Sequence, residues 1–272
     1  MEVERPLKLK IGNCHSHTSG FSLSRRRALR LALAAVGGFI VAGPAFSHPR
    51  SRKFQHVQIT TDGGHRSRAV FSDLDNPPAP AVMLVHDHWG ASASVRWVAS
   101  ELGRQGFLAV VPDLFDGRVV ENESQGRRWL ADLDANRSLD VLTSWTRWLK
   151  AHFYSTGRVA TLAWGGGCDW SLQASIRENV AAAVVYYPEQ KSARDFPADA
   201  SVPIMGHLDE RTDAAIPTTP APATYAAKGY EHWYQYSAKA GFADFIRPSF
   251  DASADALAWK RTLAFLNQRL KR

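Results

Sequence analysis

The sequence predicts an α/β protein, with a doubly wound and mostly parallel sheet in a single domain behind an N-terminal signal segment. Short runs of apolar and β-branched residues, typical of strands buried on both faces, recur along the chain. Segments with apolar residues at helical spacing separate these runs, and this alternation implies parallel strands covered by helices on both faces. The 272 residues, 45% of them hydrophobic, are sufficient for one large core, and no internal repeat is found.

The first 47 residues have the order of a secretory signal. A polar stretch ends in SRRRALR at residues 24–30, an apolar stretch covers residues 31–43, and Ala-Phe-Ser follows at residues 45–47. The paired arginines resemble a twin-arginine export signal. An uncleaved anchor is the alternative, but the apolar stretch is shorter than the ~20 residues of a spanning helix. We expect residues 1–47 to be the export signal of a periplasmic protein and its only contact with the membrane.

The positive charge of the chain lies mainly in this segment. Residues 1–47 hold seven of the 33 Lys and Arg but two of the 26 Asp and Glu, so the remainder carries 26 basic and 24 acidic side chains. No stripe of basic residues with interleaved aromatics follows, which argues against nucleic-acid binding. Of the two cysteines, Cys14 lies in the signal and Cys168 in the predicted mature domain, residues 48–272. The mature domain therefore has no internal disulfide.

The mature domain begins with two strands, at residues 55–60 and 67–71, joined by a turn of composition TDGG and forming an antiparallel edge. Helical spacing indicates helices over residues 91–105, 170–177 and 254–271, and one long helix or two in tandem over residues 125–152. The remaining strands are predicted at residues 81–86, 107–112, 159–163, 180–187, 202–207 and 231–237. Residues 209–223, rich in Pro, Thr and Ala, form the one long irregular stretch.

Three glycines separate the strand over residues 159–163 from the following helix. Gly165, Gly166 and Gly167 form a tight strand-to-helix turn, the place where some hydrolases hold a nucleophile. Glycines are expected there because the tip of such a turn is strained and its neighbours have no room for side chains.

From about Val82 to the C-terminus the chain resembles the dienelactone hydrolase family of α/β hydrolases. Four segments carry the resemblance, in the order and spacing of that family: HDHWG at residues 86–90, GFLAVVPDL at 106–114, AWGGG at 163–167 with WSL at 170–172, and RTLAFL at 261–266. The resemblance implies a single α/β-hydrolase domain that acts on small esters or lactones, without a cofactor or a metal.

In that family a cysteine at the turn attacks the carbonyl carbon, a histidine acts as base, and an aspartate orients the histidine. The nucleophile position falls on Gly165 and the base position on Ala240, so both side chains are substituted. The position of the orienting acid falls on Thr212 without a gap, on Asp213 with one inserted residue, or on Asp209 in a looser match.

Further site residues lie beside the turn. The glutamate that follows the first long strand in the family corresponds to Asp87, and the backbone of Gly166 and Asp87 is placed to form an oxyanion hole. Cys168 is a possible relocated nucleophile, because a helix N-terminus lowers the pKa of a thiol. We favour the alternative, a small buried side chain.

Three histidines follow strand ends and could approach this turn: His86, His88 and His207. His88 is a candidate base for Cys168, and the histidines with Asp87 could bind a metal. We favour structural roles, since no recognised ligand spacing is present.

Two functions from different classes remain open. The first is an exported ester or lactone hydrolase with a rearranged site. The second is a non-catalytic binding or accessory protein that uses the former active-site crevice, which the empty positions at Gly165 and Ala240 favour. Both imply a small ester, lactone or carboxylate ligand, because the backbone N–H groups of the turn still favour negative charge.

Overall fold

The computed structural model describes residues 54–189, 202–210 and 230–271. The chain divides into two compact units, Met1–Ser47 and His48–Arg272, and all described residues belong to the second. The predicted export signal and Asp213 lie outside the described residues. None of the described helices is long and apolar enough to cross a membrane.

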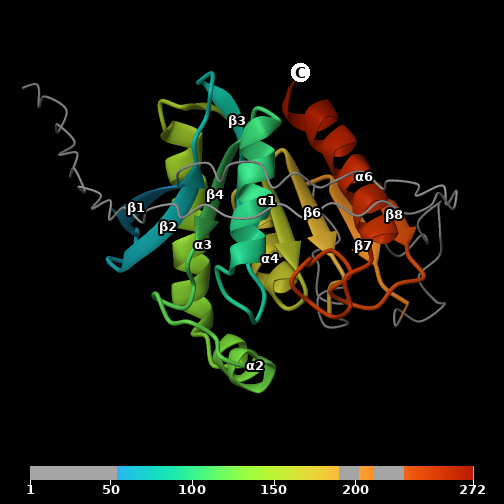
Figure 1. Ribbon diagram of the computed structural model, residues 1–272. Helices are drawn as coiled ribbons and strands as arrows, with labels where there is room; N and C mark the ends of the chain where they lie inside the picture. The colour runs from blue at the N-terminus through green and yellow to red at the C-terminus, as the bar shows by residue number, and fades with distance from the viewer. Residues whose placement is uncertain (1–53, 190–201, 211–229, 272) are drawn as a thin grey trace, which may run out of the picture. The chain divides into compact units, whose positions relative to one another are not determined.

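One mixed sheet organises the described part of the chain, with the strand order β1-β2-β4-β3-β5-β6-β7-β8 (Figure 1). β1 and β2 are antiparallel to their neighbours, and the pairs from β4 to β8 are parallel. The predicted antiparallel edge and parallel centre are therefore confirmed. The strands are β1 (Phe54–Thr60), β2 (Arg66–Ser72), β3 (Ala79–Val85), β4 (Leu108–Pro112), β5 (Ser155–Trp164), β6 (Ala182–Tyr186), β7 (Ile204–Leu208) and β8 (Tyr230–Gln235).

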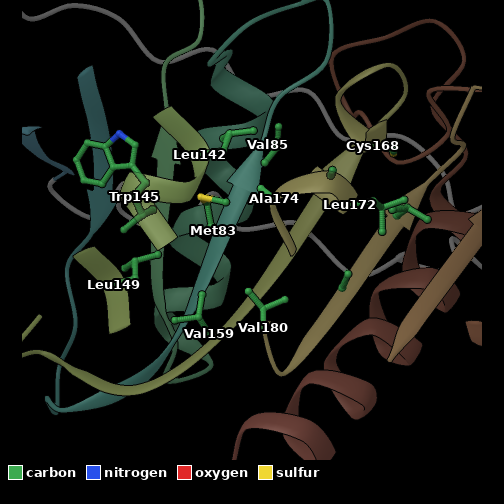
Figure 2. Packing of buried hydrophobic residues seen from close by; sticks show 14 of the residues in the cluster. Met83, Val85, Leu142, Trp145, Leu149, Val159, Cys168, Leu172, Ala174 and Val180 are labelled. Atoms are coloured by element: carbon green, nitrogen blue, oxygen red, sulfur yellow. The ribbon is translucent and has the colours of Figure 1, made fainter. Parts of the chain in front are cut away.

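Helices cover both faces of the sheet, as expected for a doubly wound fold (Figure 1). α1 (Ala93–Arg104) and α6 (Ala252–Leu270) pack on one face, and α3 (Ala135–Ala151) and α4 (Gly167–Arg177) on the other. Each face has its own apolar cluster. Figure 2 shows the cluster under α3 and α4, where Trp145 and Leu142 pack against Met83 of the central strand β3.

The long helical segment predicted over residues 125–152 is two helices. α2 (Glu123–Ala131) ends at Asp132, and α3 begins after Asp134, whose side chain accepts a hydrogen bond from the backbone N–H of Arg137. An aspartate in this position stabilises a helix start by about 1 kcal/mol, which fixes the break between the two helices.

The order of the strands reverses at one point of the sheet, between β3 and β5. From β3 the chain moves to β4 on one side, whereas β5 lies on the other side of β3 and leads on to β6. Ligands of open α/β sheets bind where the strand order reverses in this way, outside the carboxyl ends of the strands. Here those ends lead directly to Asp87 after β3 and to Gly165 after β5.

Candidate active site at the strand-to-helix turn

The turn after β5 has the sharp geometry expected of a nucleophile-bearing turn. Gly165 has a φ of +49°, and its N–H donates to the carbonyl oxygen of Tyr186 at 3.0 Å. Gly167, the first residue of α4, lies against the turn that follows β3, so that a Cβ there would be 2.3 Å from the carbonyl oxygen of His86. Only glycine fits this position, and that requirement explains part of the glycine run.

The tip of the turn has room for a side chain that the sequence does not supply. A Cβ at Gly165 would lie 3.6 Å from the Cβ of Asp87 and 4.0 Å from its Oδ2, both ordinary contacts. Gly165 and Gly166 are partly exposed. Gly165, which the sequence resemblance assigns to the nucleophile position, therefore faces Asp87, and the elbow site is defined here as Asp87, His88, Gly165, Gly166 and Gly167.

Asp87 is the acidic group of the elbow site. Its Oδ1 accepts a hydrogen bond from the backbone N–H of Trp89 at 2.8 Å, which fixes the carboxyl group. Burial raises the pKa of Asp87 to about 7. Nearby Asp244 raises it further, while Arg247 and Arg127 oppose the shift. A carboxyl group with this pKa exchanges its proton near neutral pH.

His88 lies beside Asp87 and is 9% exposed. Its Nδ1 is 3.8 Å from Asp87 Oδ2, and its Nε2 is 4.0 Å from Oε1 of Glu123, so both separations exceed hydrogen-bond distance. The buried Nε2 has no hydrogen-bond partner. Burial, reinforced by the charge of Arg127, lowers the pKa of His88 to about 4, so the ring is neutral at pH 7.

Cys168 is fully buried in the apolar cluster beneath α4 (Figure 2). Its Sγ lies 3.6 Å from the carbonyl oxygen of Tyr186. Burial raises the pKa of the thiol well above its ordinary value, and the neighbouring charge of Asp169 adds to this. The helix N-terminus does not lower this pKa, because desolvation of the thiolate outweighs the helix dipole, and the favoured reading of Cys168 as a small buried side chain agrees with the structure. The structure thus gives Cys168 the surroundings of a buried apolar residue.

Comparison with known proteins identifies the family. The dienelactone hydrolase family model matches residues 68–270. The chain belongs to the dienelactone hydrolase family. It is 26% identical to a carboxymethylenebutenolidase from Pseudomonas putida, over 77% of this chain and 94% of that protein. A putative carboxymethylenebutenolidase from Yersinia pestis is also 26% identical, over 72% of this chain and 80% of its own length.

Solved structures agree on the fold. A putative dienelactone hydrolase from Klebsiella pneumoniae superposes with a TM-score of 0.62 at 17% identity, over 80% of this chain and all of that one. A cold-adapted esterase from an Arctic intertidal metagenomic library gives a TM-score of 0.59 at 14% identity, over 81% of this chain and 95% of that one. The α/β-hydrolase fold predicted from the sequence is therefore confirmed.

Ala240 and Asp209, which the sequence resemblance assigns to the base and acid positions, lie on the loops after β8 and β7. Ala240 is partly buried against the apolar cluster under α1 and α6. Two residues later, the ring of Phe242 packs on Tyr187 at 5.5 Å between centroids, which brings this loop to the carboxyl end of β6. Asp209 directly follows β7 and is 2% exposed.

Of the three candidate histidines of this dienelactone hydrolase family member, His86 and His207 have structural hydrogen-bond partners. His86 Nδ1 donates to the carbonyl oxygen of Asp87 at 2.8 Å, and its Nε2 accepts from the N–H of Leu114 at 3.1 Å. His207 bridges the hydroxyl groups of Tyr236 and Thr262, both at 2.9 Å. Burial lowers the pKa of His86 and brings that of His207 to about 3. These two rings are neutral, and both nitrogen atoms of each ring take part in a hydrogen bond.

Several charged residues near the elbow site belong to no recognisable sequence motif, and the sequence analysis did not predict them as site residues. Arg247 stacks over the ring of Trp89, with its guanidinium carbon 3.3 Å from the ring centroid, and its Nε donates to Asp244 at 3.1 Å. Arg127 on α2 pairs with Glu123 at 2.6 Å. Among the described residues, no group of three or more His, Cys, Asp or Glu could hold a metal ion.

Proposed function

We propose that this dienelactone hydrolase family member binds small esters, lactones or carboxylates at the elbow site and lacks the cysteine-dependent reaction of its family. One observation carries the proposal: the tip of the turn is Gly165, and the nearest thiol in sequence, Cys168, lies in the core. The first N–H groups of α4 have no partner within the helix and favour an electron-rich oxygen. The relatives named carboxymethylenebutenolidase support a small-molecule ligand.

A binding measurement tests this proposal. Isothermal titration of the full chain with a small lactone and with its ring-opened acid is expected to show saturable binding. Gly165→Leu is expected to abolish binding, because the added side chain occupies the space beside Asp87. Gly64→Leu is the matched control, since Gly64 also has a positive φ, +82°, but nothing lies within 4 Å of its Cβ position.

The absence of covalent chemistry is tested separately. Iodoacetamide treatment and Cys168→Ala are expected to leave ligand binding and any esterase activity unchanged. Mass spectrometry after incubation with 4-nitrophenyl acetate is expected to show no acyl adduct on Cys168. An adduct on this residue, together with activity lost on alkylation, contradicts the proposal and favours the hydrolase with a relocated nucleophile.

We also propose that the protein is exported to the periplasm by the twin-arginine route. The order of charged, apolar and small residues in the first 47 residues supports this. Replacing Arg25 and Arg26 by Lys is expected to retain the precursor in the cytoplasm, measured by fractionation and by the mass of the mature chain. Unchanged processing rules this route out.

A further inference from the structure

The carboxyl group of Asp87 is held directly beside the tip of the turn. Its Oδ1 is fixed by the N–H of Trp89, and its Oδ2 lies 4.0 Å from the Cβ position of Gly165. A side chain at the tip would occupy the space next to this oxygen. Gly165 leaves this position without a side chain, and both glycines of the tip are partly exposed, so solvent reaches the tip.

A second polar group of the elbow site lacks a partner, on the side of the His88 ring that faces Glu123. The Nε2 atom of His88 is buried without a hydrogen-bond partner, although the ring lies between the carboxylates of Asp87 and Glu123. An unpaired buried nitrogen costs about 1–3 kcal/mol, so such groups are usually satisfied by water or by a bound molecule.

We infer that Asp87 is a general base that activates water for direct attack on the carbonyl carbon of an ester or lactone bound at the elbow site. This inference rests on the proposed binding function and adds a reaction to it. It differs from the family's route because no bond forms between the protein and the substrate.

The step balances with water as the only co-reactant. As the water oxygen bonds to the carbonyl carbon, Asp87 Oδ2 takes one water proton, and the carbonyl oxygen becomes an oxyanion facing the N–H of Gly166. The tetrahedral intermediate then breaks its bond to the alkoxy oxygen, which receives the proton from Asp87. An ester gives an acid and an alcohol, and a lactone gives a hydroxy acid.

The surroundings of Asp87 suit a base that works near neutral pH. A general base is most effective when its pKa is close to the operating pH, and burial raises the pKa of Asp87 to about 7. The neutral ring of His88 leaves the carboxylate without a strong ionic partner. The titratable and charged groups that face or influence Asp87 are His88, Arg127, Cys168, Tyr187, Asp244 and Arg247, while Glu123 faces His88.

Steady-state hydrolysis of 4-nitrophenyl acetate and of a small lactone by the full chain tests the inference. Asp87→Asn is expected to lower kcat by about 10²–10⁴-fold with little change in KM, the usual contribution of a general base. For the parent protein, kcat/KM is expected to rise with pH and level off above about 7, as Asp87 ionises. Asp87→Glu is expected to retain part of the activity, and no burst should precede the steady state.

Asp116→Asn is the matched control, because Asp116 pairs with Arg137 on the surface and should leave activity unchanged. Ligand binding that persists with no turnover above the Asp87→Asn level overturns the inference and leaves the proposed binding function intact. Absence of both binding and turnover overturns both. Circular dichroism and thermal unfolding of each variant separate loss of the base from loss of the fold.

Discussion

At the scale of single residues, the raised pKa of Asp87 lowers the free energy of unfolding at high pH, where the buried carboxyl group is ionised. Its pKa rises from 3.8 to about 7 on folding, mainly because burial disfavours the carboxylate. The folded state therefore binds this proton more tightly than the unfolded state does. The contribution to stability is present below pH 3.8 and is lost as the pH rises through about 7.

Asp87→Asn removes this titration while keeping an oxygen that accepts from the N–H of Trp89. A shift of this size corresponds to about 4 kcal/mol. We expect the variant to have a higher free energy of unfolding than the parent at pH 8, by as much as about 4 kcal/mol, and an advantage that shrinks toward pH 4. Urea denaturation at pH 4, 6 and 8 measures it, and an advantage independent of pH contradicts the assignment.

Cys168 is expected to be chemically silent in the folded protein. Full burial and a raised pKa leave almost no accessible thiolate at pH 8. In a Cys14→Ser background, 5,5′-dithiobis(2-nitrobenzoate) should release no chromophore from the native protein and one equivalent after unfolding in urea. Rapid reaction of the native protein would show that the apolar cluster opens or that the thiol is activated.

At the scale of elements, α2 and α4 each pack closely against the turn after β3 at a glycine. A Cβ at Gly126 of α2 would lie 2.0 Å from the carbonyl oxygen of His88, and one at Gly167 of α4 would lie 2.3 Å from that of His86. Real Cβ atoms do not approach backbone this closely. The backbone around Asp87 is therefore fixed by the packing of both helices.

Gly126→Ala tests this contact. In an ordinary helix this change stabilises by about 1 kcal/mol. Here it must push α2 away from His88, so we expect a loss of stability by about 1–3 kcal/mol, the range of overpacked sites, with a fall in ligand affinity. Ser124→Ala on the exposed face of the same helix is the control and should be neutral or stabilising. Stability gained on Gly126→Ala would mean that α2 is not held against this turn.

The elements were largely predictable because their signals are local. Apolar runs predicted the buried strands and helical spacing predicted the helices. Spacing left open whether residues 125–152 form one helix or two, and the structure shows two, with Asp134 capping the second. The surroundings of Asp87 were not predictable. Arg247 and Asp244 come from a loop distant in sequence, and their effect on Asp87 depends on tertiary packing that no short motif encodes.

The same limit explains why the sequence left the pKa of Cys168 open, although a buried side chain was favoured. Its position in the first turn of α4 was read correctly, and position alone favours a low thiol pKa. The side chain direction, however, is set by how α4 packs on β5 and β6, and that packing turns Cys168 into the core. Burial, which the sequence does not state, is the larger effect.

At the scale of the whole molecule, the chain has the fold of its family, while Gly165 and Ala240 occupy the positions that the resemblance assigns to the nucleophile and the base. The turn still has a positive φ at Gly165, and Phe242 still ties the loop of Ala240 to the end of β6. A cysteine at the tip has room beside Asp87, since its Cβ would make only ordinary contacts. We therefore expect the framework and the cysteine-dependent reaction to be separable.

Restoring both groups tests that separation. Gly165→Cys alone supplies a thiol without a base, and Ala240→His alone supplies a base without a thiol, so neither should gain covalent activity. The double variant is expected to hydrolyse 4-nitrophenyl acetate through an acyl-cysteine, with a burst of nitrophenolate and an adduct of acetyl mass on residue 165. The covalent route should exceed the sum of the single variants by at least about tenfold, because nucleophile and base act as a unit. If the folded double variant forms no adduct, the loop that carries Ala240 does not reach the tip, and the absent side chains are not the only difference from an active family member.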